Sequence, residues 1–257
     1  MPKYICLIPV RYFLTILLFL NCWIAPRTFA ATSAETRAFK SARQLLDAKL
    51  YGLAEMNFSR FVQEHPTSLL RAEAVLRQAE SRFFQTNYVG ALELLQQEIP
   101  QAGALAHEYQ YLIAKSYFQN GSFPAASESY AALVKKYPES AHYLEASYDE
   151  ALAESKLGHW PRVVESLQTP GGKFESAAKM QPSNRFVIDG NLLLAEAFLR
   201  QSRFDEGEKV LAQLDERATV PETKWRQNYL LCRLQMAAGR LVDALATTTN
   251  LVATAQG

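Results

Sequence analysis

Residues 108–138 read EYQYLIAKSYFQNGSFPAASESYAALVKKYP, and this stretch decides the fold. Small and apolar side chains recur three and four residues apart on both sides of Gly121, which is the pattern of two amphipathic helices. Gly121 can end the first helix in a left-handed conformation, and Pro138 cannot continue the second. The stretch therefore predicts a helical hairpin. Its pattern rests on seven positions: Ala114, Tyr117, Gly121, Phe123, Ala126, Tyr130 and Pro138.

These seven positions resemble the tetratricopeptide repeat, in which each helix carries a small residue and an aromatic one, and a proline closes the unit. The resemblance implies that the small residues let the two helices approach closely, while the aromatic side chains fill the space beyond that contact. Tyr117, Phe123, Tyr130 and Trp160 are therefore expected to belong to the core and not to contact a ligand.

Five more hairpins follow from the same template. The positions for a small residue in the six second helices lie 37, 35, 37, 44 and 37 residues apart: Ala54, Ala91, Ala126, Val163, Gly207 and Ala244. Valine occupies this position in the fourth hairpin. The family repeat is about 34 residues. We expect an all-α, right-handed superhelical solenoid with repeats at about 38–66, 72–103, 107–138, 144–172, 188–220 and 225–257; a non-repeating helical bundle is the alternative. The longest spacing is assigned to a connection in which residues 171–174 form a surface loop.

The first thirty residues have the layout of a secretory signal peptide. Lys3 and Arg11 precede an apolar run at residues 12–24, which is short for a membrane span, and Thr28 and Ala30 supply the small residues of a cleavage site. We expect cleavage after Ala30, secretion across the inner membrane and a periplasmic location with possible outer-membrane association. A retained membrane helix and a lipid anchor on Cys22 are the alternatives.

Charge and cysteine content exclude some classes of function. Removal of residues 1–30 takes three basic residues and no acidic ones from totals of 27 and 26, so the mature chain has a net charge of −2. This balance does not favour nucleic acid. Only Cys232 remains in the mature chain, so no internal disulfide is expected and the fold depends on packing.

No sequence pattern predicts catalysis, a cofactor or a metal. The four histidines are scattered, and His142 with Glu145 is read as a solvated pair without a third ligand. Residues 171–173 lack the first glycine and the Ser or Thr of a phosphate loop. Glu80 and Ser81 resemble the catalytic segment of lytic transglycosylases, but the Gly-Leu-Met-Gln segment of that family does not follow.

In the tetratricopeptide family the first helix of each hairpin lines the concave face, so binding residues are expected there. The resemblance implies a groove for an extended peptide or a helix, and the expected partners are other envelope proteins or peptides. The candidate groove residues are Glu73, Glu80, Phe84, Glu108, Tyr111, Lys115, Gln119, Tyr148, Lys156, Glu196, Arg200, Tyr229 and Arg233.

The last predicted helix carries Leu245, Leu251 and Val252 with few charges, although solenoids need a polar cap. Continuation of the chain, a partner or a second copy would cover this face. The leading hypothesis is a non-enzymatic interaction scaffold of the bacterial cell envelope, resembling helical-repeat components of outer-membrane assembly and envelope division. The alternatives are the accessory solenoid of a longer envelope enzyme, such as a wall-cleaving one, and a small-molecule or lipid-binding solenoid with an enclosed apolar groove.

Overall fold

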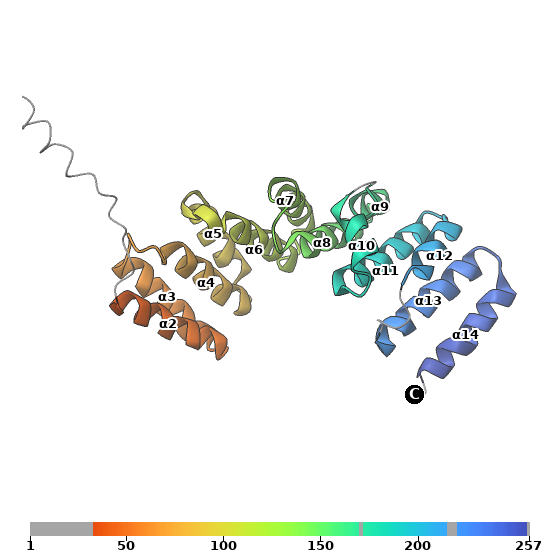
Figure 1. The fold of residues 1–257 in the computed structure, drawn as a ribbon, viewed down its shortest axis with the longest axis horizontal. Helices are drawn as coiled ribbons and strands as arrows, with labels where there is room; N and C mark the ends of the chain where they lie inside the picture. Colours follow the sequence, from red (N-terminus) through yellow and green to blue (C-terminus); the bar gives the residue numbers. More distant parts are fainter. Residues whose placement is uncertain (1–32, 170–171, 215–219, 256–257) are drawn as a thin grey trace, which may run out of the picture.

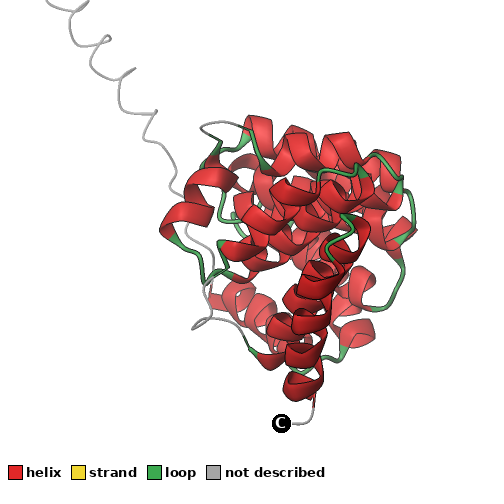
Figure 2. Ribbon diagram, turned by 90° about the vertical axis from the view of Figure 1, so that its right-hand side faces the viewer, coloured by secondary structure: helices red, strands yellow, loops and turns green. Residues whose placement is uncertain are grey.

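A computed structural model describes residues 33–169, 172–214 and 220–255, and within these ranges all regular structure is helical (Figure 2). The helices pair into six hairpins, and one extra helix, α10(Lys173–Met180), lies between the fourth and fifth. The first helices are α2(Ser33–Asp47), α4(Arg71–Phe84), α6(Ala106–Gln119), α8(Tyr143–Lys156), α11(Arg185–Arg200) and α13(Pro221–Ala237). The second helices are α3(Tyr51–Glu64), α5(Tyr88–Glu98), α7(Phe123–Lys136), α9(Trp160–Leu167), α12(Phe204–Ala212) and α14(Leu241–Ala255).

The hairpins follow one another along an elongated bow (Figure 1). The second helix of each hairpin packs against the first helix of the next, so every hairpin contacts mainly its neighbours. The second helices α5, α7 and α9 lie along the upper side of the bow in Figure 1, and the first helices lie below them. The expected all-α solenoid of six hairpins is confirmed.

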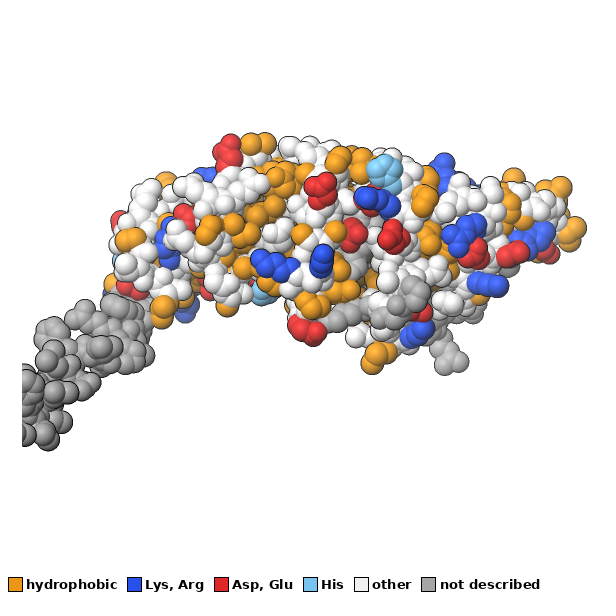
Figure 3. All heavy atoms as spheres, turned by 90° about the horizontal axis from the view of Figure 1, so that it is seen from above, with side chains coloured by type: hydrophobic (Ala, Val, Ile, Leu, Met, Phe, Trp, Pro, Cys, Tyr) orange, Lys and Arg blue, Asp and Glu red, His pale blue; other side chains and the backbone are white. Residues whose placement is uncertain are grey.

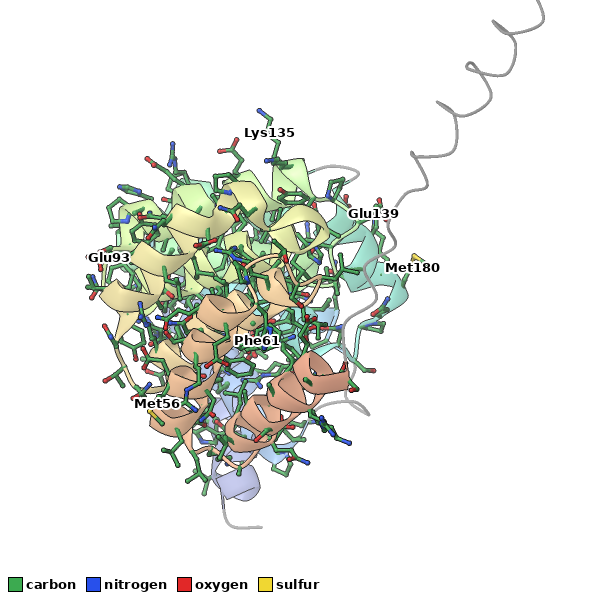
Figure 4. All side chains as sticks on the ribbon, turned by 90° about the vertical axis from the view of Figure 1, so that its left-hand side faces the viewer. Met56, Phe61, Glu93, Lys135, Glu139 and Met180 are labelled. Atoms are coloured by element: carbon green, nitrogen blue, oxygen red, sulfur yellow. The ribbon has the colours of Figure 1, made fainter. Side chains whose placement is uncertain are left out.

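Small side chains mark the closest helix contacts. The second-helix alanines expected from the repeat, Ala54, Ala91 and Ala126, have no exposed surface. A Cβ atom on Gly207 would lie 2.8 Å from Leu234 Cδ2, so α12 and α13 approach at a distance that suits glycine. Large aromatic residues fill the space between these contacts, as Phe61 does inside the first hairpin (Figure 4).

Each of the six hairpins turns through one residue with a positive φ angle. Glycine occupies this position in three hairpins, with φ of 77° at Gly121. The other three use L-residues in the left-handed conformation: Lys49, Thr86 and Ser202. In the first hairpin Lys49 stands where the repeat has glycine, which changes the cost of the turn and leaves its geometry intact.

We expect Thr86→Gly to raise the free energy of unfolding by about 0.5–1 kcal/mol. A left-handed β-branched residue is strained by roughly 1–2 kcal/mol, and the extra entropy that glycine loses on folding offsets part of this gain. Gly121→Ala is the matched control, because a Cβ atom there would meet nothing within 4 Å and only the backbone cost remains. Chemical denaturation should show opposite signs for the two variants; a destabilised Thr86→Gly would contradict the assignment.

The connection after the fourth hairpin is not the surface loop that the sequence suggested. Lys173 and Phe174 begin α10, and the Phe174 side chain is only 3% exposed. A Cβ atom on Gly190 would lie 2.3 Å from Phe174 Cζ, so the ring occupies the space that the glycine of α11 leaves open. The apolar side chain buries itself on a distant glycine, which local sequence does not reveal.

Some expectations about the ends of the chain lie outside the described residues. These are the signal peptide at residues 1–30, its cleavage after Ala30 and the lipid anchor on Cys22. The first hairpin begins at Ser33, earlier than the expected residue 38. Among the helices of the described ranges, none has both the length and the apolar character that crossing a bilayer requires.

The last helix keeps an uncovered apolar face. Leu245 is 70% exposed and Val242 is 82% exposed on α14, whereas the second helices of the other hairpins pack on a following first helix. This agrees with the apolar character that the sequence indicated for this end. Chain continuation, a partner and a second copy all stay predictions for what covers it.

Candidate functional site

A groove of about 350 Å³ lies between the first helices α6, α8 and α11. We call it the central groove. Aromatic side chains and carboxylates make up most of its surface, together with two basic residues and one exposed amide. The lining residues are Lys115, Phe118, Gln119, Tyr130, Glu145, Tyr148, Asp149, Leu152, Arg185, Phe186 and Asp189.

One end of the central groove is fixed by a stack of Tyr111 on His142. The two rings are parallel within 4° at 4.0 Å between centroids, and Lys115 Nζ lies 5.3 Å from the centre of the Tyr111 ring. Glu108 lies 2.8 Å from His142 Nε2, which ties α6 to α8. The stack is held by packing and by charge, and it lies next to Lys115 and Glu145, which line the groove.

The ion pairs around His142 stabilise its charged form. The hydrogen bond to Glu145 raises the pKa of His142 above its ordinary value, and Glu108 raises it further against the effect of burial. The pKa of Glu145 falls to about 2, chiefly because of His142, with help from the Tyr111 hydroxyl and Lys115. Glu145 therefore stays a carboxylate and is occupied by partners inside the protein.

The carboxyl group of Asp149 has a raised pKa, in contrast to that of Glu145. Burial raises its pKa to about 6, and the neighbouring Glu145 carboxylate adds to the rise; the Tyr130 hydroxyl, which donates a hydrogen bond, and Lys115 act against it. A half-buried carboxylate with little internal compensation can accept a cation or a hydrogen-bond donor from outside. Tyr148 and Phe186, with ring centroids 6.3 Å apart, supply apolar surface beside it. The arrangement suits side-chain recognition.

Asp149→Asn should stabilise the chain at neutral pH and lose that advantage in acid. Because the folded-state pKa of about 6 lies above the ordinary 3.8, the folded chain binds the proton more tightly, and ionisation of Asp149 costs stability above that range. We expect the difference in unfolding free energy between variant and wild type to shrink by about 1–2 kcal/mol from about pH 7.5 to about pH 4.5. Denaturation at a series of pH values measures it; a difference independent of pH would contradict the assignment.

The structure brings three of the sequence-predicted residues into the central groove, namely Lys115, Gln119 and Tyr148. Six others form ion pairs within or between neighbouring helices. In this group Glu73 lies 3.3 Å from Arg43, and Glu196 lies 2.8 Å from both Arg200 and Arg233. The full group is Glu73, Glu80, Glu108, Glu196, Arg200 and Arg233. These charges are paired within the protein, and the pairs of Glu73, Glu108 and Arg233 also join neighbouring hairpins.

The remaining four predicted residues lie elsewhere. Tyr111 is 7% exposed and buried in the stack, so it supports the groove from behind instead of facing a guest. Phe84 is exposed but stacks on Tyr51 near the hairpin turns. Tyr229 is exposed and parallel to Trp225, and Lys156 is an exposed residue at the end of α8.

His142 and Glu145 are more than the solvated pair that the sequence suggested. The stack with Tyr111 half-buries His142, and Glu108 comes from a helix 34 residues away. Sequence reasoning also missed Asp149, Phe186 and Asp189. A signal existed for the last, because Asp189 lies two helical turns before the predicted Glu196, on the same face of the helix.

Comparison with known proteins agrees with this geometry. Residues 108–140 match the family model described as tetratricopeptide repeat. The matched residues make up the third hairpin of the solenoid, α6 and α7. The solved tetratricopeptide repeat protein of Parabacteroides merdae ATCC 43184 has a similar fold, with a TM-score of 0.63, 14% identity, and coverage of 87% of this chain and 80% of that one.

Two further similarities extend over most of the chain. BtubC from P. vanneervenii has a similar fold, with a TM-score of 0.60, 16% identity, and coverage of 88% of this chain and 92% of that one. Over 200 residues this chain is 24% identical to "outer membrane protein assembly factor BamD" of Rickettsia prowazekii (strain Madrid E), which covers 70% of this chain and 78% of that protein.

The central groove begins in the tetratricopeptide repeat that the family model matches and extends over the next two hairpins. Tyr130 of that repeat is 1% exposed, as the family pattern implies for a core aromatic, and only its hydroxyl reaches Asp149. In the described part of the chain, no three His, Cys, Asp or Glu side chains gather in an arrangement that could hold a metal ion.

Proposed function

We propose that this protein is a non-enzymatic interaction scaffold of the bacterial cell envelope, which binds a segment of another envelope protein in the central groove. The observation that carries the proposal is the groove itself, in which the half-buried Asp149 carboxylate shares the lining with the aromatic side chains of Tyr148 and Phe186. A segment with a basic or hydrogen-bond-donating side chain beside an apolar one fits this surface.

Two observations support the envelope as the location. The relative from Rickettsia prowazekii is named as an outer membrane protein assembly factor, and the similarity covers most of both chains. Residues 1–30 also have the layout of a secretory signal peptide. The open, charged groove favours a peptide over the enclosed apolar site that a lipid or small apolar ligand prefers.

A pull-down from envelope extract tests the proposal. The bait is the natural protein, compared with a Lys115→Ala, Tyr148→Ala double variant; Tyr111 is left intact because it is buried. Glu93→Ala on the exposed surface of α5 is the matched control (Figure 4). Circular dichroism verifies that each bait is folded.

We expect wild type and the control to retain the same defined envelope protein and the groove variant to lose it. Each lost contact at the centre of an interface costs about 1–2 kcal/mol, so the double variant should weaken binding at least about tenfold. Equal capture by the folded groove variant would exclude the central groove as the binding surface.

A further inference from the structure

A second and larger cleft, of about 780 Å³, lies between α7, α8, α9 and α10. We call it the α10 cleft. Because α7 and α9 are second helices, it opens on the other side of the solenoid from the central groove. Figure 3 views the solenoid from the upper side of Figure 1. Charged side chains of both signs gather there between the positions of α7 and α9. The cleft is therefore a separate surface from the proposed binding groove.

The inserted helix α10 builds one wall of this cleft. Phe174 is 3% exposed and packs with the cluster that contains Val163, Leu167 and Phe198. Its ring fills the space over Gly190, so α10 is held against α11 by an apolar contact. Insertions in solenoids often serve the binding face. A helix anchored by a buried aromatic residue forms a preorganised wall.

The floor of the α10 cleft contains a buried carboxylate whose hydrogen bonds are complete. Glu154 is 3% exposed and accepts hydrogen bonds from Ser127, from His159 Nδ1 at 2.8 Å and from Arg162 at 3.1 Å. Burial alone would raise its pKa, but these three donors lower it. Arg162 is therefore engaged by Glu154.

Glu150, one turn before Glu154, lacks comparable compensation. It accepts a hydrogen bond of 2.8 Å from the Ser166 hydroxyl. Burial raises its pKa despite that bond, and the nearby carboxylates of Glu154 and Glu165 raise it further, while the charge of Arg162 acts in the opposite direction. Seven side chains that line the cleft belong to charged residue types, of which five are glutamates and two, Lys135 and Arg162, are basic. The lining therefore has an excess of acidic residues, and Glu150 is one of them.

We propose that the α10 cleft binds a partner-protein segment carrying lysine or arginine, with the cationic group paired to Glu150 and an adjacent apolar side chain packed against the half-buried Ala131 and Val134. The charge of the cleft attracts a cation, and its apolar lining accommodates the neighbouring side chain. Nucleic acid and anionic membrane surfaces carry charge of the same sign as the cleft and are disfavoured. The protein then has two independent contact surfaces on opposite sides.

Fluorescence anisotropy with a defined probe tests this proposal. The probe is a labelled short peptide that repeats lysine, leucine and serine, titrated with the full chain at physiological ionic strength. A second peptide has glutamate in place of lysine. Glu150→Gln removes the charge and retains an acceptor for Ser166, and Glu93→Gln on α5 removes an exposed charge elsewhere (Figure 4).

We expect the lysine peptide to bind and the glutamate peptide to bind at least about tenfold more weakly. Glu150→Gln should weaken binding of the lysine peptide about tenfold, whereas Glu93→Gln should change it less than about twofold. Equal affinity for both peptides would overturn the proposal. Equal affinity of Glu150→Gln and Glu93→Gln for the lysine peptide would overturn it as well. If Tyr148→Ala weakened binding of the lysine peptide and Glu150→Gln did not, the peptide would bind in the central groove. This result would also overturn the proposal.

A gain of binding makes the test independent of folding defects. Lys135 lines the cleft and is exposed, while Lys136 is exposed and does not line it. Lys135→Glu should tighten binding of the lysine peptide about threefold, and Lys136→Glu, with the same change of charge, should have a smaller effect. An equal effect of the two substitutions would show that the overall charge of the protein attracts the peptide, and it would contradict specific binding in the α10 cleft.

Discussion

Replacement of Tyr111 by alanine is expected to lower the free energy of unfolding by about 3–4 kcal/mol. The ring is 7% exposed, lies parallel to His142 at 4.0 Å and contacts Tyr130 at 6.3 Å between centroids. Its loss leaves a cavity between α6 and α8 and removes the support behind Lys115 and Glu145, which line the central groove. Chemical denaturation of the purified chain measures the change.

Tyr111→Phe is the control for this prediction. Phenylalanine retains the stack on His142 and loses only the hydroxyl contacts with Lys115 and Glu145, so we expect a loss of about 1 kcal/mol. If Tyr111→Ala were as stable as wild type within about 1 kcal/mol, Tyr111 would be a surface residue of the groove and its assignment to the core would be wrong.

Phe198→Ala is expected to cost about 3–5 kcal/mol, the largest effect of any single substitution considered for this chain. Phe198 has no exposed surface and packs with Val163 and Val210, which join the fourth and fifth hairpins. Because solenoid stability is approximately a sum over hairpins and their interfaces, the damage should stay local. Amide exchange should accelerate in α11 to α14 and change little in α2 to α5.

Phe84→Ala provides the matched comparison, since Phe84 is 52% exposed and only stacks on Tyr51. We expect it to cost less than about 1 kcal/mol. Uniform acceleration of exchange along the whole chain in Phe198→Ala would show that the solenoid unfolds as one unit and would contradict the local account.

The hairpins were predictable from the sequence because their contacts are local. Ala114 and Ala126 lie only 12 residues apart, and both are completely buried where α6 meets α7. Gly121, Gly158 and Gly239 mark turns that favour glycine. Repetition of these local signals at near-constant spacing was sufficient to predict six hairpins.

The site was less predictable because its geometry depends on contacts between hairpins. A position one turn along a first helix can face the groove, as Tyr148 does, or be covered by the next hairpin, as Tyr111 is by His142. The helix α10 packs on α11 where Phe174 meets Gly190, a contact that no local pattern contains. Most predicted charges are likewise satisfied by neighbouring hairpins, which a single-repeat template does not show.

Photocrosslinking from the central groove in living cells tests the central claim most directly. A photoreactive phenylalanine analogue replaces Gln119, which is exposed and lines the groove, and in a second variant replaces Met180, which is 80% exposed on α10 (Figure 4). We predict that position 119 forms an adduct with one defined envelope protein, that position 180 does not form it, and that Tyr148→Ala reduces it. The same adduct from both positions would contradict the account. So would adducts at position 119 if all of them were with proteins from outside the envelope.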